Sequence, residues 1–142
     1  MAPPRWSAAY AGAVSGVVVV IAVFLPWYAT NLGEPFSPAS VSGWDSTNFA
    51  RGAVIAAAVA TIAAVTLALE ERGSVVLEPQ TGEALAWVVI GAFALALILV
   101  GYRLLVMPEP ADLLSRQIGL YLATVAAIIG VLSGLGLLAT RR

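Results

Sequence analysis

Four long segments of the chain contain no Asp, Glu, Lys or Arg. They run from Trp6 to Gly33, from Gly52 to Leu69, from Ala84 to Tyr102 and from Gln117 to Thr140. A helix needs roughly 20 mostly apolar residues to cross the hydrocarbon layer of a bilayer, and in lipid it satisfies its own backbone hydrogen bonds. The first and last segments are long enough alone, and the middle two can be lengthened by uncharged polar or interfacial residues near their ends. We therefore predict an all-α membrane protein whose four transmembrane helices run up, down, up and down.

The composition favours lipid over water as the main solvent of the folded chain. Of 142 residues, 61% are hydrophobic and 11% are charged, whereas a soluble domain carries about 25% charged residues. Any one segment would suit a buried helix of a soluble protein, but four leave too little polar chain to cover such a core. We expect a single four-helix transmembrane domain over residues 1–142. Its predicted helices lie at about 7–27, 47–70, 82–107 and 111–139, with an outer loop at 28–50.

We predict that the first segment is a retained helix and not a cleaved signal peptide. Residues Phe24 to Tyr28 are bulky where a cleavage site needs small side chains.

The arginines predict the orientation in the membrane. Four crossings place both termini and the second loop on one side. That side holds Arg5, Arg72, Arg141 and Arg142, and the other holds Arg51, Arg103 and Arg116. Because cytoplasmic segments carry an excess of basic residues, we predict a multi-pass protein of the cell inner (plasma) membrane with both termini in the cytoplasm.

The residue types that are absent narrow the possible chemistry. The chain has no Cys and no His, which removes disulfides, thiol catalysis and the usual general base and metal ligand. A net charge of −1 offers no basic surface for nucleic acid. All acidic residues lie in predicted loops or at helix ends, so no carboxylate marks an ion path through the membrane. We expect a protein that is not an enzyme and binds no cofactor.

Four acidic residues surround the second loop. They are Glu70, Glu71, Glu78 and Glu83. They could gather a divalent cation, but carboxylates in such loops are far more often simply solvated. We predict no metal site.

Small residues recur at helical spacing in three of the four segments. Gly12 and Gly16 form one GxxxG motif, Gly130 and Gly134 form another, and Ala56, Ala60, Ala64 and Ala68 form a ridge. Such ridges let neighbouring backbones approach closely in membranes. They serve helix packing either within the chain or between two chains, with the internal arrangement as the default.

The first loop is the most distinctive part of the chain. Its turn-forming residues favour a short hairpin with arms near Tyr28–Asn31 and Ala39–Trp44. We expect Trp27 and Trp44 to stack at the boundary and Arg51 to reach Asp45 or backbone carbonyls. A plain aromatic belt with a snorkelling arginine would explain Trp27 and Arg51, but explains the Gly43-Trp44 pair in mid-loop less well.

The order Trp27, Gly43-Trp44 and Arg51 resembles the claudin-like four-transmembrane superfamily, which includes claudins, peripheral myelin proteins and channel auxiliary subunits. The resemblance implies an auxiliary or adhesive role. In that family the loop tryptophan is followed by a disulfide-bridged strand pair. Here there is no cysteine, and six residues separate Trp44 from Arg51. The chain is also similar to small uncharacterised four-helix membrane proteins of actinobacteria, which implies a bacterial source.

Arg103 lies near the end of the third predicted helix. Glu109 or Asp112 could pair with it across the next turn. A snorkelling arginine there most often anchors the depth of its helix, and the functional alternative is contact with a lipid headgroup or another ion.

Two function classes follow. The first is an auxiliary, scaffolding or adhesion-type interaction subunit of a membrane complex, whose partners are membrane lipids and either another membrane protein or a second copy. The alternative is a lipid- or small-molecule-handling membrane protein with a groove between helices near Arg103 and Tyr121. A lipid-modifying enzyme would need a catalytic pair, and the sequence offers none.

Overall fold

The computed structural model describes residues 7–30, 39–46, 48–105, 114–116 and 118–139. This part of the chain is mostly helical. Its elements are α1 (Ala8–Val23), β1 (Pro26–Thr30), β2 (Ala39–Ser42), α2 (Gly43–Ser46), α3 (Asn48–Glu71), α4 (Pro79–Leu105), β3 (Leu114–Arg116) and α5 (Ile118–Ala139). Within the described residues, α3, α4 and α5 are long and apolar enough to cross a membrane, and α1 is a shorter apolar helix.

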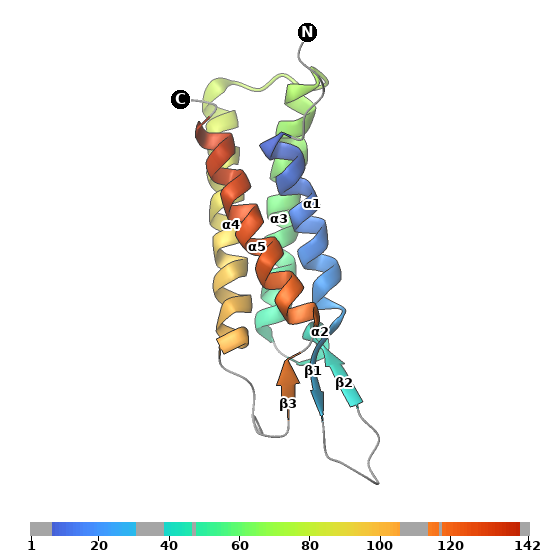
Figure 1. Ribbon diagram of the computed structural model, residues 1–142. Helices are drawn as coiled ribbons and strands as arrows, with labels where there is room; N and C mark the ends of the chain where they lie inside the picture. The colour runs from blue at the N-terminus through green and yellow to red at the C-terminus, as the bar shows by residue number, and fades with distance from the viewer. Residues whose placement is uncertain (1–6, 31–38, 47, 106–113, 117, 140–142) are drawn as a thin grey trace.

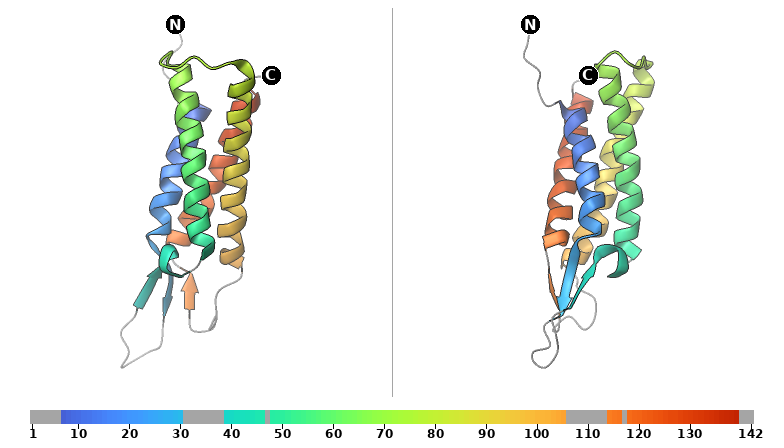
Figure 2. Two further views of the ribbon diagram at one scale, coloured as in Figure 1. Left: turned by 180° about the vertical axis from the view of Figure 1, so that it is seen from behind. Right: turned by 90° about the vertical axis from the view of Figure 1, so that its right-hand side faces the viewer.

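The four long helices lie side by side and alternate in direction (Figures 1 and 2). Each packs on two others, in the cyclic order α1, α3, α4, α5. α1 begins and α5 ends at the same end of the bundle, and the three strands lie at the opposite end. We call this second end, formed by β1, β2, β3, α2 and the adjoining helix turns, the strand end.

Alanine is the most frequent residue in the interior, and many large apolar side chains lie on the exterior. In α3 the buried positions include Ala53, Ala57 and Ala60, whereas Ile55 and Ile62 are 67% and 69% exposed. Exposed Val, Leu and Ile side chains continue over α1, α4 and α5. A soluble monomer rarely exposes so large an apolar surface, and close packing through small residues is typical of helices in lipid.

The glycine motifs pack within the chain. A Cβ added to Gly130 would lie 2.6 Å from Cδ2 of Phe93, and one added to Gly134 would lie 2.6 Å from Cγ1 of Ile90, both on α4. A Cβ on Gly12 would lie 3.3 Å from Cβ of Ala64 on α3, and one on Gly16 would collide with the Thr61 hydroxyl. These four glycines therefore bring α1 against α3 and α5 against α4.

Two predicted helix boundaries are wrong. The first helix ends at Val23 rather than near 27, because the amides of Phe24 and Leu25 bond only three residues back, to Ile21 and Ala22, and Pro26 has no amide hydrogen to continue the helix. The fourth helix begins at Ile118 instead of 111, because residues 114–116 form β3. Residues 110–113 lie outside the described part of the chain.

The other two helices lie close to their predicted positions. α3 begins and ends one residue later than expected, and α4 begins at Pro79 rather than 82, since proline suits the first turn of a helix. The predicted end of this helix at 107 lies outside the described residues.

The expected hairpin is present, and a third strand joins it. β1 pairs antiparallel with β2 through Tyr28↔Val41, Ala29↔Ser40 and Thr30↔Ala39, with a bulge near Pro26. β3 pairs with the other edge of β1, giving the order β2-β1-β3. β1 is therefore the central strand, and it lies directly below the end of α1 (Figure 1).

Candidate functional site at the strand end

Trp27 is the buried centre of the strand end. Its side chain is fully buried, and its Nε1–H donates to the carbonyl oxygen of Ala22 at 2.9 Å. Ala22 lies in the last turn of α1, so the ring folds back onto the helix that precedes it. The bond satisfies the one polar group of a buried indole, as burial requires.

Two glycines allow close approaches at this site, one to the Trp27 ring and one to the backbone just before it. A Cβ on Gly43, the first residue of α2, would collide with the Trp27 indole. A Cβ on Gly119, in the first turn of α5, would lie 2.7 Å from the carbonyl oxygen of Pro26 and 2.9 Å from that of Ala22. The start of α2 thus packs on the Trp27 ring and the start of α5 packs on the backbone between α1 and β1, and a side chain at either glycine position would separate these elements.

Trp44 lies between an aromatic ring and a guanidinium group. Its ring stacks on Phe24 with centroids 5.3 Å apart and an interplanar angle of 25°. Cζ of Arg51 lies 5.3 Å from the ring centroid, and Nε of Arg51 donates to the Trp44 carbonyl oxygen at 2.9 Å. One arginine on α3 therefore holds both the ring and the backbone of α2.

Ser42 and Asp45 cap the short helix α2. The Asp45 amide donates to Oγ of Ser42, and that hydroxyl donates to Oδ2 of Asp45, both at 3.3 Å. A serine at the N-cap with an acid three residues later is a helix-starting arrangement. Its place directly after β2 explains why the chain turns here.

The predicted stacking of Trp27 on Trp44 is wrong. Phe24 stacks on Trp44, and Trp27 lies in the core instead of at an interfacial belt. The guanidinium of Arg51 reaches a backbone carbonyl, one of the two partners expected for it. Sequence reasoning overlooked Phe24 and Gly119, because neither differs in type from the apolar and small residues around it.

The groove expected near Arg103 and Tyr121 stays a prediction. Cζ of Arg103 lies 5.7 Å from the ring centroid of Phe49, which makes an edge-to-face contact with Tyr102 at 5.1 Å. Tyr121 is half exposed on α5. The grooves between α1 and α5 and between α1 and α3 are lined by neither residue, and the proposed partners Glu109 and Asp112 lie outside the described residues.

The four glutamates near the second connection do not gather into a metal site. Glu70 and Glu71 end α3, whereas Glu78 precedes α4 and Glu83 lies in its second turn. Over the described ranges, no group of three or more His, Cys, Asp or Glu side chains is arranged to hold a metal ion.

No family model, curated protein or solved structure matches this chain.

Proposed function

We propose that the chain is a non-enzymatic integral membrane protein that acts as an auxiliary or scaffolding subunit and binds a membrane-protein partner through its strand end. The observation that carries this proposal is the closed arrangement around Trp27 and Trp44. A buried ring, two glycine contacts and an arginine clamp hold α1, α2, α3 and α5 together there. Such a rigid base reduces the ordering cost of binding a partner.

The surface of the strand end has the composition of a protein-binding patch. Phe24, Phe49 and Tyr102 are 54%, 39% and 48% exposed, and Arg51 and Arg103 lie against aromatic rings among them. Aromatic residues and arginine are enriched at interfaces and supply most hot spots. We call Phe24, Trp44, Phe49, Arg51 and Tyr102 the aromatic patch.

We further propose that all four helices cross the cell inner membrane, with both termini cytoplasmic and the strand end outside. α1 has 16 residues, which corresponds to about 24 Å, and Phe24 and Leu25 extend its apolar length. Arg51 and Arg103 lie toward the strand end, and Arg72 follows α3 at the other end. Along the whole sequence, the side of the termini holds four arginines against three on the side of the strand end: Arg5, Arg72, Arg141 and Arg142 against Arg51, Arg103 and Arg116. This weak basic excess supports cytoplasmic termini.

A relation to the claudin-like superfamily remains a proposal. The residues that carry the resemblance, Trp27, Gly43-Trp44 and Arg51, form one connected group in this structure. Their contacts give a physical reason for their order along the chain, and they support an organised extramembrane end without a disulfide.

The test is affinity purification from cross-linked host membranes, comparing the native chain with Trp44→Ala and with Trp87→Ala. Trp87 is an exposed tryptophan in α4 toward the other end of the bundle, so it controls for the loss of a large ring. We expect a stoichiometric membrane protein that co-purifies with the native chain and with Trp87→Ala but is lost with Trp44→Ala.

Two results would contradict the proposal. One is the absence of a stoichiometric partner across several mild detergents and cross-linkers. The other is a partner that co-purifies with Trp44→Ala and with Phe49→Ala but not with Trp87→Ala. That result would place the interface at the other end of the molecule.

A further inference from the structure

Ser15 differs from the other hydroxyl residues in the interior of the helices. Thr61, Thr124 and Ser133 each donate to the carbonyl oxygen four residues earlier, at 2.7, 2.9 and 2.8 Å. Ser15 is 5% exposed, no hydrogen bond of its hydroxyl is found within the described part of the chain, and its oxygen is open to a groove instead of fully enclosed. Buried hydroxyls nearly always have a partner, and hydrocarbon supplies none.

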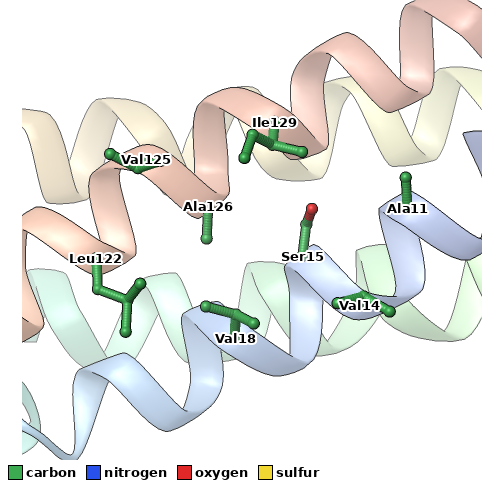
Figure 3. A pocket seen from close by; sticks show the side chains of 8 residues that line it. All are labelled: Ala11, Val14, Ser15, Val18, Leu122, Val125, Ala126 and Ile129. Atoms are coloured by element: carbon green, nitrogen blue, oxygen red, sulfur yellow. The ribbon is translucent and has the colours of Figure 1, made fainter.

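The Ser15 hydroxyl points into an apolar groove between α1 and α5 (Figure 3). The groove has a volume of about 330 Å³. Ala11, Ser15 and Ala126 form its floor, and the half-exposed side chains of Val14, Val125 and Ile129 form its rim. The groove therefore opens toward the lipid and contains one polar atom at its base.

The shape of the groove favours a small apolar molecule over a second copy of this chain. Two copies related by a twofold axis would bring two concave surfaces together, and two recessed Ser15 hydroxyls could not meet. The volume lies at the lower end of the range for small-molecule sites, which are mostly apolar with few polar groups that fix orientation.

The depth of Ser15 narrows the chemistry of the occupant. Ser15 is the eighth of the 16 residues of α1, so it lies about 10–12 Å from either end of that helix. The ester oxygens of phospholipids are held at the headgroup boundary, and their acyl chains carry no oxygen at this depth. A serine hydroxyl can accept a hydrogen bond or donate one. In the donating mode, its partner would be a carbonyl that is free to enter the hydrocarbon layer.

We propose that the α1–α5 groove binds a membrane-dissolved quinone that carries a prenyl or alkyl chain. The Ser15 hydroxyl donates to a ring carbonyl, and the small-residue floor accommodates the ring between the two helices. The site lies away from the aromatic patch, so it does not depend on the proposed partner interface.

The groove between α1 and α3 provides an internal comparison. It has a similar volume of about 290 Å³ and is also lined by apolar side chains. Its hydroxyl residue, Thr61, already donates to the Ala57 carbonyl at 2.7 Å. This second groove offers no unsatisfied donor, and we assign it no quinone.

The test measures stabilisation of the full chain in lipid nanodiscs as decyl-benzoquinone is titrated, with decylbenzene as the carbonyl-free control. Stabilisation by a bound ligand follows RT ln(1 + [L]/Kd), so its dependence on concentration gives the apparent affinity. We expect stabilisation of this form with the quinone only. Ser15→Ala should weaken the apparent affinity about fivefold, which corresponds to the net free energy of one typical hydrogen bond. Ile129→Trp, which narrows the rim of the groove, should abolish binding. Thr124→Ala, which removes a hydroxyl that does not line the groove, should leave the affinity unchanged.

Three outcomes would overturn the assignment. They are equal stabilisation by decylbenzene, an affinity that Ser15→Ala leaves unchanged, and efficient disulfide dimerisation of Ser15→Cys within the membrane. The last outcome would assign the groove to a second copy. Without ligand, the Ser15→Ala and Ile129→Trp variants should both unfold at the native midpoint. If Ile129→Trp does not fold, the affinity of Ser15→Ala alone tests the assignment.

Discussion

At the scale of single residues, the strand end depends on how closely other groups approach Trp27. The indole is buried, bonded to Ala22 and covered by the backbone of Gly43. Only a residue without a Cβ permits this approach. Gly43 is therefore required because a side chain would not fit above the Trp27 ring, and not because of an unusual backbone conformation.

Gly43→Ala should lower the free energy of unfolding by about 1–3 kcal/mol, the usual cost of forcing an extra carbon into a packed site. Denaturation by dodecyl sulfate in mixed micelles measures it. Gly91→Ala is the matched control, because its added Cβ meets nothing within 4 Å. That control should be neutral or stabilising by up to about 1 kcal/mol, as helix propensity predicts. Equal losses in the two variants would contradict the assigned contact.

Part of this site could be predicted from the sequence. Gly43, Trp44 and Arg51 were identified because a Gly-Trp pair in mid-loop and an arginine at a helix start are unusual in so apolar a chain. The partner of Trp44 could not be predicted. Phe24 and Trp27 are both aromatic residues near the end of the first helix, and only the early end of α1 at Val23 decides which of them stacks on Trp44.

At the scale of elements, the short sheet shows where local patterns fail. The hairpin of β1 and β2 follows from the turn-forming residues between its arms, and it was predicted. β3 was not, since Leu114, Ser115 and Arg116 have no strand-like alternation and follow two prolines that suggested a helix start. They pair because β1 offers a free edge, and an unpaired edge is costly to leave open.

The central position of β1 predicts slow amide exchange. Both of its edges are paired, whereas β2 is an edge strand, so we expect amides in Pro26–Thr30 to exchange more slowly than those in Ala39–Ser42. Hydrogen–deuterium exchange with mass spectrometry in nanodiscs measures the difference. Equal exchange of the two strands would mean that β3 does not pair stably with β1.

Helix packing predicts a specific pair of compensating substitutions. Gly130→Ala forces a Cβ against the Phe93 ring and should cost about 1–3 kcal/mol. Combining it with Phe93→Leu should relieve part of that cost, giving a coupling of about 0.5–3 kcal/mol in a double-mutant cycle. The control cycle uses Gly101→Ala, whose Cβ meets nothing within 4 Å, and should be additive. Additivity in the Gly130 cycle would contradict the α4–α5 contact.

At the scale of the whole molecule, the distribution of side-chain size is the main physical result. Alanine is the most frequent buried residue of the described chain, packed around a few large side chains such as Trp27 and Phe93, and Ile, Val and Leu are the main exposed residues of the helices. The uncharged segments predicted apolar helices, and α3, α4 and α5 are long and apolar enough to span a bilayer. Which face of each helix points inward could not be deduced from hydrophobicity, because both faces are apolar. The spacing of the small residues carried that information.

The central claim is that lipid surrounds this apolar exterior, so that the two ends of α3 lie on opposite faces of a membrane. The chain has no cysteine, so single substitutions can be labelled without background. Asn48→Cys and Ser74→Cys, at exposed positions at the start of α3 and just beyond its end, should be tested in intact cells and in inverted membrane vesicles with a membrane-impermeant maleimide. We predict that Asn48→Cys reacts only from outside intact cells and Ser74→Cys only in inverted vesicles. Reaction of both cysteines from the same side, or recovery of the chain as a soluble monomer without detergent, would contradict the account.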